Sequence, residues 1–146
     1  MSHFSGLAGP GGPILNVHIG LSVPRIQAMQ SAGVPLPATQ LAQLLIDTGA
    51  SHTVIDDRFV QLLGLQPTGT VSMLTPSTGA TPHQAATYDV AMYVIGHASA
   101  IHHLPVQPVT ACPMSHQGID GLIGRDILAA ARLTYSGPDN FFYLSF

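Results

Sequence analysis

The chain has 146 residues, which suits one domain with a buried core and is too short for two domains of ordinary size. Its formal charge comes from four Arg and seven Asp, which gives a net charge of −3. This charge balance does not predict a basic surface that would bind nucleic acid. Cys112 is the only cysteine, which excludes an intramolecular disulfide. The first residues lack the pattern of a signal peptide, and no apolar run reaches the roughly 18 residues that span a bilayer. We therefore expect a soluble cytoplasmic protein without a membrane partner.

The first third of the chain is predicted to contain a flexible start, two strands and a helix. Residues 1–13 are rich in Gly, Ser and Pro, which is typical of a flexible arm. Residues 14–19 alternate in polarity with the period of a half-buried strand. Ser22 and Gly33 are the start and stop signals of a short helix between them. The apolar run over 39–46 then predicts a second strand.

A third strand, over 53–55, leads directly into a second helix. Asp56 is a suitable N-cap for a helix over 57–63, and Gly64 is its stop signal. Asp57 lies in the first turn, where the helix dipole favours a negative charge. Both aspartates are therefore interpreted as structural and not as catalytic.

The second half of the chain is predicted to be mainly strand. Two stretches of strand character, 71–74 and 87–93, flank a tip of small residues over 75–82 and predict a hairpin. The remaining elements are expected to be strand and loop over 94–109, a helix over 125–132 and a closing hairpin of 133–135 with 141–146.

Two separated motifs carry the chemistry. In the first, a buried-strand pattern over 44–46 leads into Asp47, Thr48 and Gly49, so one carboxylate stands at the start of a sharp turn. Glycine lets backbone and water approach the carboxylate, and the threonine hydroxyl is small enough to bond while buried. The second motif, over 121–128, is an apolar pair, a glycine and a polar pair that opens a short apolar helix.

Together, in this order and with the hairpin between them, the two motifs resemble the retropepsin family of single-domain aspartic proteases. The resemblance covers residues 14–146, with 20–38 as a probable insertion relative to the retroviral members. It implies a mainly β fold, a closed acid-protease barrel with a flap hairpin and short helices, that is active as a homodimer. The hairpin tip occupies the place of the flap, which closes over bound peptide.

The implied activity is that of an aspartic endopeptidase. Such chemistry needs two carboxylates that share a proton, one as base toward water and one as acid toward the carbonyl oxygen. The chain supplies one suitable residue, Asp47, so a homodimer would place it beside its symmetry mate. The substrate would be a peptide or protein, and no metal, cofactor or covalent intermediate is required.

The resemblance also implies roles for individual residues. The catalytic motif is Asp47, Thr48 and Gly49. Substrate contacts are implied for Gly49, Ala50, Ser51, Val54, Ser77, Thr78, Gly79 and Leu122. Structural support of the site is implied for Gly124, Arg125 and Asp126. Arg125 pairs with an acid in the retroviral pattern; here the matching residue is Ser51, a neutral acceptor, and Asp126 is expected either to take over as charge partner or to cap the helix.

Two other functions remain open from the sequence. One is a catalytically silent dimer of the same fold that binds peptides or proteins without cutting them, because fold does not determine function. The other is metal binding, which the spacing of the candidate ligands does not favour. Those candidates are His97, His102, His103, Cys112 and His116. Cys112 is expected to be a small buried apolar residue.

Overall fold

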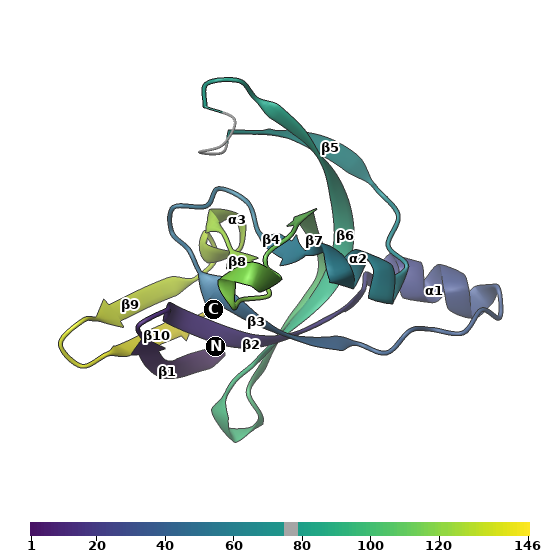
Figure 1. Cartoon of the computed structure of the whole chain (residues 1–146). Coiled ribbons are helices and arrows are strands. Elements are labelled where there is room, and N and C mark those ends of the chain that lie inside the picture. Colours follow the sequence, from purple (N-terminus) through teal and green to yellow (C-terminus); the bar gives the residue numbers. More distant parts are fainter. Residues whose placement is uncertain (75–78) are drawn as a thin grey trace.

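A computed structural model of the chain describes all residues except 75–78 and is mainly β (Figure 1). The strands are β1 (His3–Gly9), β2 (Gly12–Leu21), β3 (Gln40–Ile46), β4 (Val54–Asp56), β5 (Gly69–Met73), β6 (His83–Ile95), β7 (Ile101–Cys112), β8 (Gly121–Ile123), β9 (Arg132–Ser136) and β10 (Phe141–Ser145). The helices are α1 (Val23–Ser31), α2 (Asp57–Leu63) and α3 (Arg125–Leu128), with 3-10 turns η1 (His97–Ser99) and η2 (Ser115–Gln117).

Six of the strands close into a barrel, as predicted. The strand order is β5-β6-β7-β4-β8-β3-β2-β1-β10-β9, and the additional pairing of β6 with β2 closes the ring. The hairpin of β5 and β6 extends beyond the barrel and arches above β8 and α3 (Figure 1). Closure leaves the barrel strands without free edges, so their backbone groups are paired within the fold.

The barrel interior follows the alternation seen in the sequence. Leu15, Val17 and Ile19 of β2 are buried, and their neighbours on β3, Ala42 and Leu44, are at 0 % exposure. Successive side chains of a strand point to opposite faces, so this alternation selects one inward face on each strand. The predicted strands over 14–19 and 39–46 are therefore confirmed.

The first residues do not form the flexible arm that their composition predicted. Residues 3–7 pair with β10 in an antiparallel ladder, from His3 opposite Ser145 to Leu7 opposite Phe141. Phe4, at 1 % exposure, is in the hydrophobic core. Glycine and serine content indicated local freedom, but one buried aromatic ring and pairing with the C-terminal strand β10 order the segment. The predicted C-terminal hairpin is confirmed as β9 and β10.

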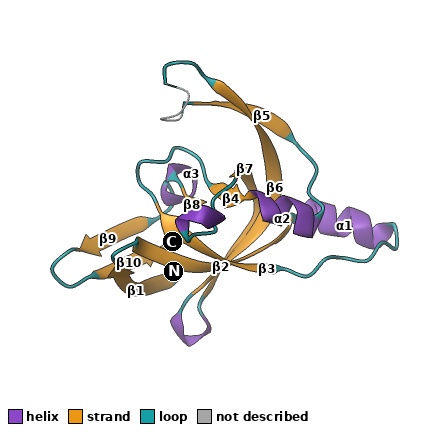
Figure 2. Ribbon diagram, viewed as in Figure 1, coloured by secondary structure: helices purple, strands orange, loops and turns teal. Residues whose placement is uncertain are grey.

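The helices are short and lie outside the barrel (Figure 2). In α2, the Asp56 side chain accepts a hydrogen bond from Arg58 N at 3.0 Å, and Gly64 ends the helix with a φ of 60°, as predicted. The helix over 125–132 is shorter than predicted, because Arg132 already pairs with Ser145 in the β9–β10 ladder. Within the part of the chain that the structure describes, no helix has the length and apolar character needed to cross a membrane.

Candidate active site

Asp47 stands immediately after β3, at one end of the barrel. Its backbone N donates to Ile123 O at 3.0 Å, and its own Oδ1 accepts from Gly49 N at 2.8 Å. A Cβ on Gly49 would lie only 3.1 Å from this oxygen, so glycine permits the close turn. Asp47 is half-buried, whereas Thr48 and Gly49 are exposed. The carboxylate is thus fixed by its own loop and still reachable.

The two sequence motifs meet because β3 and β8 pair in parallel. Leu44 lies opposite Gly121 and Ile46 opposite Ile123, so Asp47 and Gly124 follow neighbouring strands at the same end. A Cβ on Gly124 would lie 2.5 Å from the carbonyl carbon of His52 and 2.6 Å from its oxygen. The glycine of the second motif therefore lets the loop that carries the predicted catalytic motif, residues 47–53 and below called the catalytic loop, pack directly against β8.

Arg125 supports this loop through the backbone. Its Nη1 donates to Thr48 O at 2.9 Å and its backbone N donates to Ala50 O at 2.8 Å. The expected contact with Ser51 is not formed; the hydroxyl of Ser51 lies 3.0 Å from Nδ1 of His52 instead. The guanidinium instead binds a backbone carbonyl oxygen, which ties Arg125 to the turn after Asp47.

Asp126 holds the far side of the catalytic loop. Its carboxylate accepts from Thr53 N at 3.0 Å, from Thr53 Oγ1 at 2.7 Å and from Gln107 Nε2 at 3.1 Å. It also accepts from Ile127 N at 2.9 Å. Neither predicted role of Asp126 is seen: Gly124 is the N-cap of α3, without a side-chain cap bond, and among the described residues Asp126 forms no ion pair with Arg125. Gly124 N in turn donates to Thr53 Oγ1 at 3.1 Å. Sequence analysis missed Thr53 and Gln107, because their partner is far away in the chain and carries no local signal.

The predicted substrate-binding residues are brought together only in part. Val54 and Leu122 are directly opposite each other on β4 and β8, next to the catalytic loop. Gly79 lies in the exposed turn between β5 and β6 with a φ of 59°. The predictions for Ser77 and Thr78 fall on residues outside the described part of the structure.

A cavity of about 460 Å³ lies between the catalytic loop and the β5–β6 hairpin. Its walls include His52 of the loop, Val71 of β5, Thr87 of β6 and Thr110 of β7. A second cavity, of about 380 Å³, is bordered by Thr48 and by residues of α3 and β9. The catalytic loop therefore has hollows on two sides.

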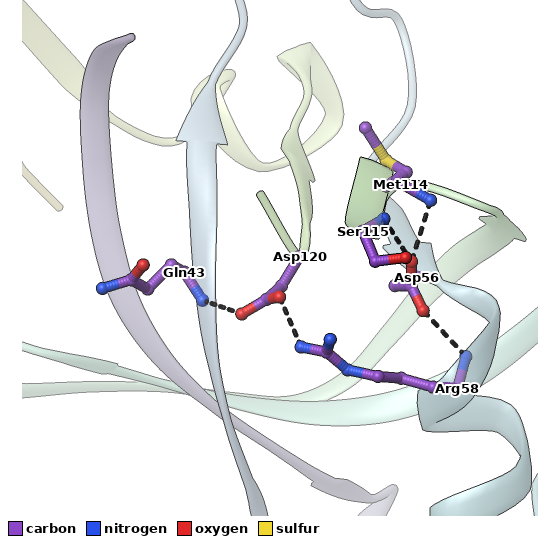
Figure 3. A network of polar contacts seen from close by, with 6 residues as sticks. All are labelled: Gln43, Asp56, Arg58, Met114, Ser115 and Asp120. Atoms are coloured by element: carbon purple, nitrogen blue, oxygen red, sulfur yellow. Dashed lines mark hydrogen bonds and ion pairs between the residues drawn. The ribbon is translucent and has the colours of Figure 1, made fainter. Parts of the chain in front are cut away.

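A network of buried and half-buried carboxylates anchors the strands that carry the site (Figure 3). Asp120, just before β8, accepts from Gln43 N of β3 at 2.8 Å and forms an ion pair with Arg58. Asp56 accepts from Arg58 N at 3.0 Å and from the backbone N of both Met114 and Ser115 at 2.8 Å. Through these bonds the middle of β3, the end of β4 and the start of β8 hold one position relative to one another.

The charge state of Asp56 reflects this environment. Burial by itself raises the pKa of the carboxyl, but three backbone N–H donors and the positive charge of Arg58 together outweigh burial and hold the pKa below its ordinary value of 3.8. Asp56 is therefore a structural anion, as the sequence predicted, and it also organises a loop that the sequence did not connect with it.

The residues weighed as metal ligands do not assemble into a site. Among the described residues, no three His, Cys, Asp or Glu side chains lie close enough to hold an ion. His102 stacks on Phe146 with ring centroids 3.9 Å apart, and His103 stacks on Tyr93 at 4.5 Å, on the other face of β7. Cys112, expected to be buried, is exposed at the end of β7. The prediction was wrong because the strand ends there and turns its last side chain outward.

Comparison with known proteins decides the family. A family model described as aspartyl protease matches residues 38–127, more than half of the chain, including the first motif and all but the last residue of the second. The chain belongs to the aspartyl protease family. No functionally curated protein is significantly similar to it.

Two solved structures resemble this aspartyl protease family member. A retropepsin-like aspartic protease from Rickettsia conorii shares 16% identity and a TM-score of 0.58, covering 97% of this chain and 89% of the other. The retroviral protease-like domain of Ddi1 from Leishmania major shares 13% identity and a TM-score of 0.41, covering 88% of this chain and 86% of the other. The first match shows that the fold is retropepsin-like.

Proposed function

We propose that this protein is an aspartic endopeptidase that cuts peptide bonds as a homodimer. The observation that carries the proposal is the position of Asp47, which is half-buried, held by Gly49 N and placed at the open end of the parallel β3–β8 pair. Membership of the aspartyl protease family and the retropepsin-like fold support a protease-type function.

The dimer follows from the chemistry of one carboxylate per chain. A water molecule must lose a proton to one carboxylate while a second, protonated carboxyl donates to the peptide carbonyl oxygen. Two-fold symmetry would bring Asp47 of two copies together so that they share one proton. Asp47 is next to Thr48 and Gly49, which are exposed. A partner copy that approaches Asp47 would therefore first contact the loop that carries these residues.

The surface around the loop suits such a contact. Thr48, Arg125, Leu128 and Leu133 border a largely apolar hollow of about 380 Å³ next to the catalytic turn. A partner side chain in this hollow would bury apolar surface close to the paired aspartates. The same contact would keep Thr48 and Arg125 in position. These two residues are already joined by a 2.9 Å hydrogen bond from Arg125 Nη1 to Thr48 O.

The β5–β6 hairpin is proposed to act as the flap over bound peptide. It arches above β8 and α3 (Figure 1), and Asp47 N bonds to Ile123 O of β8. Gly79 in its turn has a φ of 59°, a conformation that side chains rarely adopt, and it leaves the backbone accessible to a substrate. A peptide between the hairpin and the catalytic loop would touch Val54 and Leu122.

Cleavage of a diverse peptide library tests the proposal. The wild type is assayed over roughly pH 3 to 8, where paired carboxylates act as acid and base, alongside Asp47→Asn and the control Asp57→Asn, an exposed carboxylate outside the site. We expect cleavage by the wild type and by the control and none by Asp47→Asn. Specific activity should also fall on dilution through the dimer dissociation constant.

Each contrary result has a distinct meaning. Cleavage that survives in Asp47→Asn would refute the assignment of the catalytic residue. Specific activity that stays constant at every dilution would refute the shared site. Binding of peptides by a folded wild type that cuts none of them would instead support a catalytically silent binding protein.

A further inference from the structure

A cavity of about 150 Å³ is bordered by helices α1 and α2 and by strand β6. Its lining includes Ser22 and Arg25 at the start of α1, Gly64 at the end of α2 and Asp89 of β6. The two helices are neighbours on one side of the barrel (Figure 1). None of the lining residues belongs to the catalytic loop or to the two cavities beside that loop. The cavity is therefore separate from the candidate active site.

Two opposite charges line this cavity without pairing with each other. Arg25 is exposed and Asp89 is half-buried. Among the residues that the structure describes, the only ion pair is that of Arg58 with Asp120, so the guanidinium of Arg25 and the carboxylate of Asp89 stay apart. A cavity with one cation and one anion in its wall is complementary to a ligand that carries both signs of charge.

The positive part of the wall is the start of α1. Ser22 is the N-cap residue, is 6 % exposed and makes no side-chain cap bond. Its hydroxyl, which lines the cavity, has no hydrogen-bond partner in the described part of the chain, although buried hydroxyl groups are usually paired. The first N–H groups of a helix also lack partners inside the helix and carry a partial positive charge. With the guanidinium of Arg25, this hydroxyl and helix end suit a carboxylate.

The negative part of the wall combines Asp89 with the end of α2. Gly64, with a φ of 60°, ends this helix, and Leu65 follows it in the cavity lining. The carbonyl groups at the end of a helix carry a partial negative charge. Carboxylate and carbonyl oxygens accept hydrogen bonds from an ammonium group, which donates three. This part of the wall therefore suits the ammonium end of the same ligand.

The volume and the remaining wall limit the ligand further. A cavity of this size holds a molecule of about six non-hydrogen atoms. Leu21, Leu65 and Pro67 supply apolar wall for a small apolar side chain. An inorganic anion would be repelled by Asp89 and a metal ion by Arg25. In the described residues, no three His, Cys, Asp or Glu side chains lie close enough to hold a metal ion here.

We propose that this cavity binds a small free α-amino acid, glycine or L-alanine, with its carboxylate at Arg25 and Ser22 and its ammonium group at Asp89. A free amino acid carries both charges on one carbon atom, whereas a residue inside a peptide carries neither of them. The cavity thus selects free amino acids over peptides. The inference does not depend on the proposed protease function, because it concerns other residues and its test measures binding.

Titration of the wild type, followed through the amide NMR signals of Gly64 and Thr68 in the cavity lining, tests the proposal. The probes are L-alanine, L-alaninamide, which lacks the carboxylate, and N-acetyl-L-alanine, which lacks the ammonium group. L-Alanine should shift both signals with a Kd on the order of 1 mM or below, as its few atoms allow. Each analogue should bind about tenfold more weakly, because one charge of the cavity then has no partner.

Charge-removing variants assign each end of the ligand. Arg25→Gln should weaken L-alanine binding about tenfold and leave L-alaninamide binding unchanged, because that analogue has no carboxylate to lose. Asp89→Asn should weaken L-alanine binding in the same way and leave N-acetyl-L-alanine binding unchanged. The matched controls are Arg132→Gln, exposed on β9, and Asp57→Asn, exposed on α2, neither of which lines the cavity. Both controls should bind L-alanine like the wild type.

Three results would each overturn the inference. The first is no shift of either signal by L-alanine at up to about 20 mM, well above the expected Kd. The second is equal binding of L-alanine and its two analogues. The third is L-alanine binding that survives unchanged in Arg25→Gln. Because Arg25 is exposed, its replacement should leave the fold intact, and L-alanine should raise the Tm of the wild type but not that of Arg25→Gln.

Discussion

Replacing Asp56 with Asn should destabilise the protein far more than the same change at its neighbour Asp57. Asp56 accepts bonds from the backbone N of Arg58, Met114 and Ser115 at 2.8 to 3.0 Å, and it is 5 % exposed. The Asn oxygen can keep the Met114 and Ser115 bonds, which both reach Oδ2, but without charge assistance. Its amide group would face Arg58 N, donor against donor, so the helix cap is lost.

These losses add to about 2–3 kcal/mol, roughly 1 kcal/mol for the cap and the rest for two weakened bonds to a former charge. For a chain of this size that corresponds to a fall in Tm of roughly 5–10 °C. Asp57 is exposed, so Asp57→Asn should cost less than about 1 kcal/mol, mainly from the helix dipole. Urea unfolding of the three proteins at one fixed concentration measures the difference, because dimer formation would make stability depend on concentration.

The pH dependence of the same experiment has a definite sign. The native pKa of Asp56 lies below its ordinary value of 3.8, so the folded state holds this proton more weakly than the unfolded state. The stabilisation is therefore complete above pH 3.8 and is lost as pH falls through the native pKa. The difference in the free energy of unfolding between the wild type and Asp56→Asn should become smaller in this acidic range. Equal stabilities of the Asp56 and Asp57 variants near neutral pH would refute the reasoning.

Two further predictions concern the packing of the site and the C-terminal strand. Gly124→Ala should lower stability by about 2 kcal/mol or more, because its Cβ would lie 2.5 Å from the His52 carbonyl carbon, whereas Gly11→Ala, with nothing within 4 Å, should be neutral in thermal unfolding. Equal Tm values for the two variants would contradict the close packing. Burial and then the neighbouring His103 lower the pKa of His102 below 6.5, so the folded state prefers the neutral ring and stability should fall as pH drops below 6.5. Urea unfolding of His102→Phe should show a smaller loss over this range, and an identical loss would contradict the assignment.

Local signals in the sequence were sufficient for several elements. Strand alternation over 14–19 and the cap and stop residues of α2, Asp56 and Gly64, were confirmed because their causes lie within a few residues. The assignment of Asp47 to a turn after a buried strand rests on the same kind of signal. The family resemblance is supported by the match over 38–127.

The partners of polar groups were decided only by the tertiary structure. Thr53 and Asp126 are 73 residues apart and meet because β3, β8 and β4 pair side by side. Arg125 was expected near Ser51 and instead reaches the carbonyl oxygen of Thr48, a choice that depends on angstrom-scale positions of the loop.

The sequence by itself determined the strands over 14–19 and 39–46, the cap and stop residues of α2 and the turn that carries Asp47, because these depend on side-chain period and backbone preference over a few residues. Tertiary packing decided that the first residues are ordered, because they form β1, which pairs with β10. Packing also decided that Thr110 of β7 lies opposite Thr87 of β6. Both depend on register between strands far apart in the chain, and register is fixed only when the whole barrel closes.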